Sequence, residues 1–137
     1  MIEFLHVSKA YPNGVDAVKD LTFTIKKGEE VFITGPAGAG KSTIFKLLIK
    51  DELPTSGTVM FDDVSLNSLS DKEIPYIRRK FGIVFQDLKL LPDRTVEDNI
   101  SFILHTIGIS HSERKERISR LLGLLGLEKK YSLLPNE

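Results

Sequence analysis

The sequence predicts an α/β fold with an antiparallel β edge, a core of buried parallel strands and a helical region that begins near Thr95. Three observations support this prediction. Apolar residues alternate with polar ones in the second half of residues 17–25, which is typical of a half-buried strand. Residues 30–34 carry consecutive apolar side chains, as in a parallel strand that is covered on both faces. After Thr95, apolar residues recur at helical spacing.

Composition narrows the class of protein. The 137 residues suit one domain, and 19 basic against 19 acidic residues give no net charge. That balance argues against a protein that binds nucleic acid mainly by charge. Cysteine is absent, which excludes disulfides, thiolate metal sites and a cysteine nucleophile. The sequence shows neither a membrane-spanning apolar run nor a signal peptide, so we expect a cytoplasmic protein that reaches a membrane only through a partner.

The first part of the chain is expected to alternate strands and turns around one helix. Asn-Gly and Pro-Thr-Ser-Gly runs mark the turns, because these residues tolerate the backbone angles that turns require. The helix is predicted from apolar residues at i, i+3 and i+4. The expected strands are residues 2–7, 17–25, 30–34, 58–61 and 82–85, and the expected helix is residues 41–50.

Two helices are expected in the last third of the chain. Thr95 with Asp98, and Ser110 with Glu113, have the spacing of helix-capping residues. Glu113 and Arg117 are placed for an ion pair on the exposed face of the second helix. The expected apolar stripes are Ile100, Ile103, Leu104 and Ile107 in the first helix, and Ile118, Leu121, Leu122 and Leu125 in the second.

A glycine-rich run joins the predicted strand at 30–34 to the predicted helix at 41–50. Gly35-Pro36-Ala37-Gly38-Ala39-Gly40-Lys41-Ser42 satisfies the pattern G-x-x-x-x-G-K-[ST]. Its glycines let the backbone close around a phosphate, and the N–H groups form an anion nest at a helix N-terminus. The lysine then reaches the β- and γ-phosphates, and the serine hydroxyl binds Mg²⁺. The alternative is a glycine-rich turn that binds nothing.

Hydrolysis of a bound nucleotide requires a second strand that ends in a metal-binding aspartate. Residues 59–63 form an apolar run that ends in Asp62 and Asp63, about ten residues after the predicted helix. The run is short, so we interpret it as a hairpin turn. We therefore expect this chain to lack the metal-binding strand.

The loop and its neighbours make the chain resemble an ABC-type ATPase subunit, a P-loop NTPase, over its whole length. Tyr11 precedes the loop by about 24 residues and is similar to the aromatic residue that stacks on adenine in that family. Phe85-Gln86-Asp87 resembles the Q-loop, in which Gln86 would contact Mg²⁺ and sense a transmembrane partner. Residues 54–57 and 98–100 resemble the turn after the first helix and the start of the helical subdomain.

Within that family, the run Asp93-Arg94-Thr95-Val96 favours the cell-division branch over lipoprotein-release and macrolide-export relatives. The resemblance implies an intact protein that binds ATP and Mg²⁺, forms a homodimer and couples to an FtsX-like or other transmembrane permease. It would then lie at the inner face of the cell membrane. The alternatives are the ATPase subunit of a solute or lipoprotein transporter, and a non-catalytic nucleotide-binding fragment.

The resemblance also implies that catalytic motifs are absent. In the family, the signature motif follows a segment like residues 134–137, and the Walker B strand, catalytic glutamate and switch histidine come later. We expect residues 1–94 to form the nucleotide-binding core and residues 95–137 an incomplete helical subdomain. Such a chain would be inactive in hydrolysis, marginally stable, and apolar on the exposed faces of its last helices.

The predicted nucleotide site consists of the loop and two flanking residues. It comprises Tyr11, Gly35, Pro36, Ala37, Gly38, Ala39, Gly40, Lys41, Ser42, Thr43 and Gln86, with Ser42 and Gln86 as Mg²⁺ ligands and no catalytic residue. Without the loop nearby, Tyr11 would be interpreted as a turn aromatic and Gln86 as a polar residue at a strand end. The histidines lack metal-ligand spacing, and residues 78–80 are expected to form a solvated basic turn.

Overall fold

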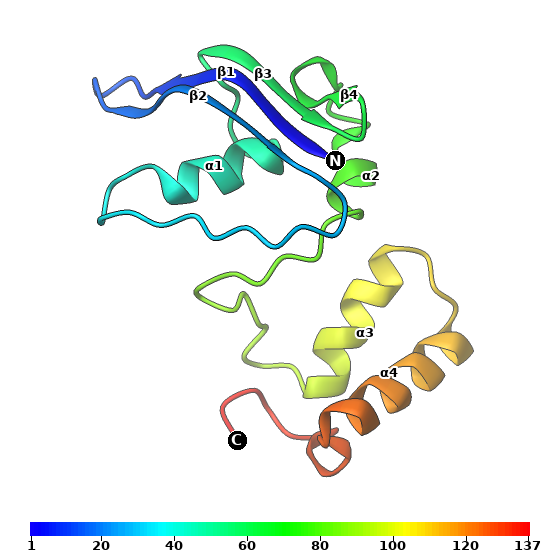
Figure 1. The fold of residues 1–137 in the computed structure, drawn as a ribbon. Helices are drawn as coiled ribbons and strands as arrows, with labels where there is room; N and C mark the ends of the chain where they lie inside the picture. The colour runs from blue at the N-terminus through cyan, green and yellow to red at the C-terminus, as the bar shows by residue number, and fades with distance from the viewer. The chain divides into compact units, whose positions relative to one another are not determined.

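The computed structural model describes residues 1 to 137 and divides them into two compact units, Met1–Phe81 and Gly82–Glu137 (Figure 1). The first unit is α/β, as the sequence predicts, and the second is helical. The first contains β1 (Ile2–Ala10), β2 (Asp16–Ile25), α1 (Lys41–Leu48), β3 (Ser56–Phe61), β4 (Val64–Ser65), the 3-10 turn Leu66–Ser68 and α2 (Ile74–Arg78). The second contains α3 (Val96–Thr106), α4 (His111–Leu125) and the 3-10 turn Glu128–Lys130.

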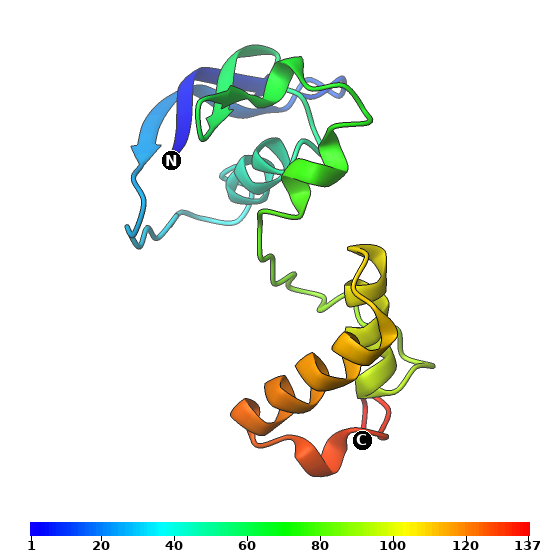
Figure 2. The same ribbon diagram turned by 90° about the vertical axis from the view of Figure 1, so that its right-hand side faces the viewer.

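The sheet of the first unit is antiparallel throughout, in the order β2-β1-β3-β4. Helix α1 packs on one face of it, and both ribbon views show the helix alongside the strands (Figures 1 and 2). Burial of apolar side chains between the helix and the strands is the main force that holds α1 in place. The buried core consists of Phe4, Val7, Val18, Leu47, Val59 and Leu66.

A bulge in β1 explains why its buried residues do not alternate. Phe4 pairs with Phe23 and Val7 with Leu21, so β1 carries one residue more than β2 between these pairs. His6 takes up the extra length with a φ of 50°. A bulge of this kind rotates the side chains that follow it. Phe4 and Val7 are therefore both fully buried although three positions separate them.

The strands predicted at residues 30–34 and 82–85 are not formed, and this part of the prediction is wrong. Both segments lie outside the sheet, and the side chains of Phe32 and Val84 are 87% and 90% exposed. Parallel strands are buried on both faces and depend on neighbouring strands for their hydrogen bonds. The sheet provides no parallel neighbour for either segment, so their apolar sequence does not produce a strand.

The interpretation of residues 59–63 as a hairpin turn is confirmed. β3 and β4 pair antiparallel, and the two residues between them, Asp62 and Asp63, have φ values of 45° and 65°. Two consecutive residues with positive φ are the mark of a tight turn whose twist matches that of the strands. Asp62 and Asp63 are therefore turn residues in this structure.

The basic run at residues 78–80 is more than the solvated turn that the sequence predicts. Arg78, at the end of α2, donates from Nε to the carbonyl of Ile49 at 2.8 Å and from Nη2 to that of Lys50 at 3.0 Å. These carbonyls follow the C-terminal end of α1, where a cation also compensates the helix dipole. Arg78 thus fixes the far end of the helix that begins at the phosphate loop.

The caps predicted for the helices of the second unit are confirmed. Thr95 and Asp98 form a reciprocal capping box at the start of α3. Ser110 accepts a hydrogen bond from the backbone N–H of Glu113 at the start of α4, and Glu113 pairs with Arg117 at 2.7 Å. None of the helices has the length and apolar character that a membrane span requires.

The buried face of α4 is narrower than the sequence predicts. Ile118 and Leu122 are buried, but Leu121 and Leu125 are 40% and 61% exposed. Helix α4 packs against α3 and the 3-10 turn Glu128–Lys130, and these two neighbours cover only part of its broad apolar stripe. The exposed apolar side chains expected on the last helices are found.

Removal of the α3 cap provides a test of this local structure. Thr95→Ala is expected to lower the free energy of unfolding by about 1 kcal/mol, because a side-chain acceptor for the Asp98 N–H is lost. Ser119→Ala, on the exposed side of α4, is the matched control and should change it by less than about 0.5 kcal/mol. Urea unfolding followed by circular dichroism measures both, and equal effects would contradict the capping role.

Candidate functional site

The N-terminus of α1 has no side chain to cap it. The residue before the helix is Gly40, with φ 81° and ψ 5°, and the first helical hydrogen bond runs from the Ile44 N–H to the Gly40 carbonyl at 3.1 Å. By contrast, Thr95 and Ser110 cap α3 and α4 with their side chains. The first N–H groups of a helix need acceptors and carry partial positive charge. An anion such as phosphate is therefore the natural acceptor at α1.

The glycines give the loop before α1 a backbone shape that other residues do not readily adopt. Gly38 and Gly40 both have φ near 81°, in the left-handed region. A Cβ atom on Gly40 would lie 2.0 Å from the carbonyl oxygen of Ala17 in β2. The loop is thus pressed against the sheet at Gly40, which fixes where the helix begins.

The side chain of Lys41 bridges the two ends of the loop. Its Nζ donates to the carbonyls of Gly35 and Pro36, each at 2.7 Å. An ammonium group has three N–H donors, so one remains for a phosphate oxygen. The ammonium group and the uncapped N–H groups of α1 both favour a bound anion.

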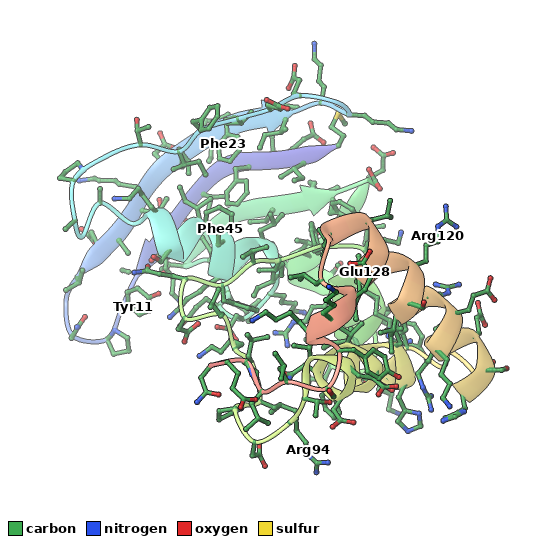
Figure 3. All side chains as sticks on the ribbon, turned by 90° about the horizontal axis from the view of Figure 1, so that it is seen from below. Tyr11, Phe23, Phe45, Arg94, Arg120 and Glu128 are labelled. Atoms are coloured by element: carbon green, nitrogen blue, oxygen red, sulfur yellow. The ribbon has the colours of Figure 1, made fainter.

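Tyr11 lies beside this loop although it is far away in sequence. Together with Val15, Ala17 and residues 38–43 it lines a hollow of about 240 Å³. The Tyr11 hydroxyl is 3.5 Å from Oγ1 of Thr43, whose side chain is buried in α1. Figure 3 labels the Tyr11 side chain beyond the end of β1. The first unit therefore brings together the predicted aromatic residue and the loop, including Ser42.

Gln86 lies in the second unit and is exposed. It is therefore not one of the residues that the first unit gathers around the loop. Asp87, the next residue, accepts a hydrogen bond from Lys89 at 2.5 Å, which lowers the pKa of the Asp87 carboxyl. Leu88 and Lys89 have φ values of 55° and 49°, so this segment is a tight turn rather than the end of a strand.

Sequence reasoning missed Lys9 and Glu52. Lys9 Nζ lies 5.1 Å from the centroid of the Tyr11 ring and 2.7 Å from Oε2 of Glu52. The sequence contains no signal for the first contact, because β1 ends at Ala10 and Tyr11 lies outside the strand. It also contains no signal for Glu52, which follows α1 and meets Lys9 only in the folded unit.

The comparison with protein families gives a match to the family described as ABC transporter over residues 18–136. The cell division ATP-binding protein FtsE of Bacillus subtilis (strain 168) is 45% identical over 137 residues, which are 100% of this chain and 60% of that protein. FtsE of Escherichia coli (strain K12) is 42% identical, over 98% of this chain and 61% of the relative. The methionine import ATP-binding protein MetN 2 of Bacillus cereus is also 42% identical, over 100% of this chain and 41% of the relative.

A solved structure of an ATP-binding cassette also resembles this chain. The ATP-binding cassette MJ0796, in a dimeric post-hydrolysis state bound to ADP and Pi, has a TM-score of 0.87 and 35% identity. The match covers 99% of this chain and 62% of the cassette. The chain thus spans about 60% of the length of the FtsE relatives. Since the family match extends over most of its residues, the chain belongs to the ABC transporter family of ATP-binding proteins.

Proposed function

We propose that the chain binds ATP with Mg²⁺ through residues 35–43 and stacks the adenine on Tyr11. The observation that carries the proposal is the uncapped N-terminus of α1 behind a loop of left-handed glycines. The Lys41 ammonium and the nearby Tyr11 ring add a charge for the phosphates and a flat surface for the base. In the related cassette MJ0796, the bound groups are ADP and Pi.

Mg²⁺ would neutralise the charge of the β- and γ-phosphates when it is bound. Ser42 would provide the hydroxyl ligand from the first turn of α1, next to the loop. Gln86 is proposed as a second ligand on the basis of the family resemblance alone. Functionally, we propose residues 1–94 as the nucleotide-binding core and 95–137 as the start of a helical subdomain.

The intact protein is proposed to couple MgATP binding and hydrolysis to a membrane partner in cell division. The FtsE relatives support this role, with identities of 42–45% that extend over 98–100% of the chain. The partner would be an FtsX-like or other transmembrane permease, and would hold the protein at the inner face of the membrane. The dimeric structure of MJ0796 supports a homodimer.

A transport role is the second candidate, because MetN 2 is as similar in identity as the Escherichia coli FtsE. The two roles differ in what deletion of the whole gene does to the source cell. A division role predicts filamentous cells with normal methionine uptake. A methionine import role predicts the reverse, and would overturn the assignment to cell division.

Nucleotide binding is tested by thermal unfolding of the chain. MgATP at about 100 times its Kd should add about 2.7 kcal/mol to the free energy of unfolding. We expect phosphate release by the 137-residue chain to equal the buffer rate, because a phosphate loop alone does not position the attacking water. The absence of any stabilisation would contradict nucleotide binding. Turnover that is lost in Lys41→Ala would contradict the proposal that the chain is non-catalytic.

The Tyr11 ring should provide affinity for the base. Tyr11→Ala is expected to weaken MgATP binding by about 5- to 150-fold, since stacking on an aromatic side chain contributes about 1–3 kcal/mol per base. Tyr11→Phe keeps the ring and loses only the hydroxyl near Thr43. Calorimetry should therefore give Tyr11→Phe an affinity within about threefold of wild type. If both variants bind like wild type, the base does not stack on Tyr11.

A further inference from the structure

The Lys9 side chain lies over the Tyr11 ring. Its Nζ is 5.1 Å from the ring centroid, within the range of a cation–π contact. The same ammonium donates to the Leu53 carbonyl at 2.8 Å and pairs with Oε2 of Glu52 at 2.7 Å. Two groups from the segment after α1, the Glu52 carboxylate and the Leu53 carbonyl, thus hold the ammonium against this ring.

The pair between Lys9 and Glu52 is more covered than other ion pairs of the structure. Its side chains are 13% and 28% exposed, against 52% and 45% for Arg117 with Glu113. A fully exposed ion pair does little to fix the positions of its side chains, because water and salt screen the attraction between the charges. Partial burial and the additional carbonyl acceptor favour a fixed position for the Lys9 ammonium.

Other contacts also restrict Tyr11. The Tyr11 backbone N–H donates to the Val15 carbonyl at 2.9 Å, and the hydroxyl at the far end of the ring is 3.5 Å from Oγ1 of Thr43. Lys9 adds a contact on the ring itself. These contacts fix how the ring is inclined relative to the phosphate loop.

We propose that Lys9, locked by Glu52, is a positioning residue for the Tyr11 ring and leaves only the opposite ring face for the base. A cation and a purine cannot occupy the same face of one ring, because each needs direct contact with its π electrons. Lys9 does not touch the nucleotide in this arrangement and acts only through Tyr11. The inference rests on the proposed stacking of adenine on Tyr11.

A purely structural role for Lys9 would be to tie β1 to the segment after α1. The two roles differ in how they affect ligands with and without a base. MgATP needs the ring and the loop, whereas magnesium tripolyphosphate needs only the loop. A misplaced ring weakens the first ligand and spares the second, but a distorted loop weakens both.

The experiment measures the Kd of MgATP and of magnesium tripolyphosphate by calorimetry on the 137-residue chain. The variants are Lys9→Ala, which removes the cation, and Glu52→Gln, which releases it but retains a hydrogen-bonding side chain. Glu113→Gln, in an ion pair of the second unit, is the control. Circular dichroism checks that each variant is folded, and Glu52→Gln carries the test if Lys9→Ala does not fold.

We expect Lys9→Ala to weaken MgATP binding by about three- to tenfold and Glu52→Gln by about two- to fivefold. Tripolyphosphate affinity should stay within about twofold of wild type in both variants and in the control. In a Tyr11→Ala background, Lys9→Ala should have no further effect on MgATP binding, because the ring through which it acts is gone.

Two results would overturn the positioning role. One is unchanged MgATP affinity in both variants, and the other is an equal loss for MgATP and tripolyphosphate. Failure of the proposed function has a different signature, since wild-type chain would then bind neither ligand. If wild type binds both with equal affinity, the loop binds phosphate but the base does not stack, and Lys9 has nothing to position.

Discussion

Lys41→Ala is expected to weaken MgATP binding by about 10- to 150-fold, as follows from the loss of a charged hydrogen bond of about 1.5–3 kcal/mol. Lys41 Nζ contacts only the Gly35 and Pro36 carbonyls of the exposed loop among the described hydrogen bonds, so the fold should change little. At an ATP concentration of 100 times the wild-type Kd, a 100-fold loss lowers the ligand-induced stabilisation from about 2.7 to about 0.4 kcal/mol. Thermal unfolding with and without MgATP measures this difference.

Lys46→Ala is the matched control for this experiment. Lys46 is an exposed lysine on the same helix, in its last turn, and it does not line the hollow beside the loop. Its removal takes away the same charge, so a general electrostatic effect would appear in both variants. Equal loss of MgATP stabilisation in Lys41→Ala and Lys46→Ala would contradict a specific role of Lys41.

Gly40→Ala should lower the free energy of unfolding more than Gly28→Ala does. The new Cβ would lie 2.0 Å from the Ala17 carbonyl oxygen, and the residue would also need a φ of +81°. The nearest atoms that the new Cβ would meet belong to the backbone of β2, which cannot move aside as the end of a flexible side chain would. We expect the free energy of unfolding to fall by about 3 kcal/mol or more, with loss of MgATP binding. Urea unfolding and calorimetry measure the two effects.

Gly28→Ala separates the contact from the backbone angle. Gly28 has a φ of +85°, but a Cβ there meets nothing within 4 Å. Its replacement should therefore cost only the left-handed strain, about 1 kcal/mol, and leave nucleotide binding unchanged. If Gly40→Ala is no more harmful than Gly28→Ala, the loop is not pressed against β2 in solution.

Local signals in the sequence were sufficient for α1, α3 and α4 and for the loop, but not for α2, which was not predicted. Thr95 with Asp98 and Ser110 with Glu113 predicted the starts of α3 and α4 because capping depends on residues three apart in the chain. The glycine spacing likewise predicted where α1 begins. These features are determined by neighbours in sequence.

Features that depend on distant partners were not predictable in this way. The runs at 30–34 and 82–85 have strand composition, but a strand requires a paired neighbour, and the sheet offers them none. Leu121 and Leu125 are exposed because the elements that pack against α4 cover only part of its apolar face. Glu52 meets Lys9 only because the segment after α1 returns to β1.

Backbone amide shifts test most directly whether residues 35–43 and Tyr11 bind the nucleotide. The ¹⁵N–¹H spectrum of the 137-residue chain would be recorded during titration with MgATP. Nucleotide binding at the loop predicts the largest shifts at Gly38, Gly40, Lys41, Ser42 and Tyr11, around the uncapped end of α1. Shifts confined to α3 and α4, or none at saturating MgATP, would contradict it.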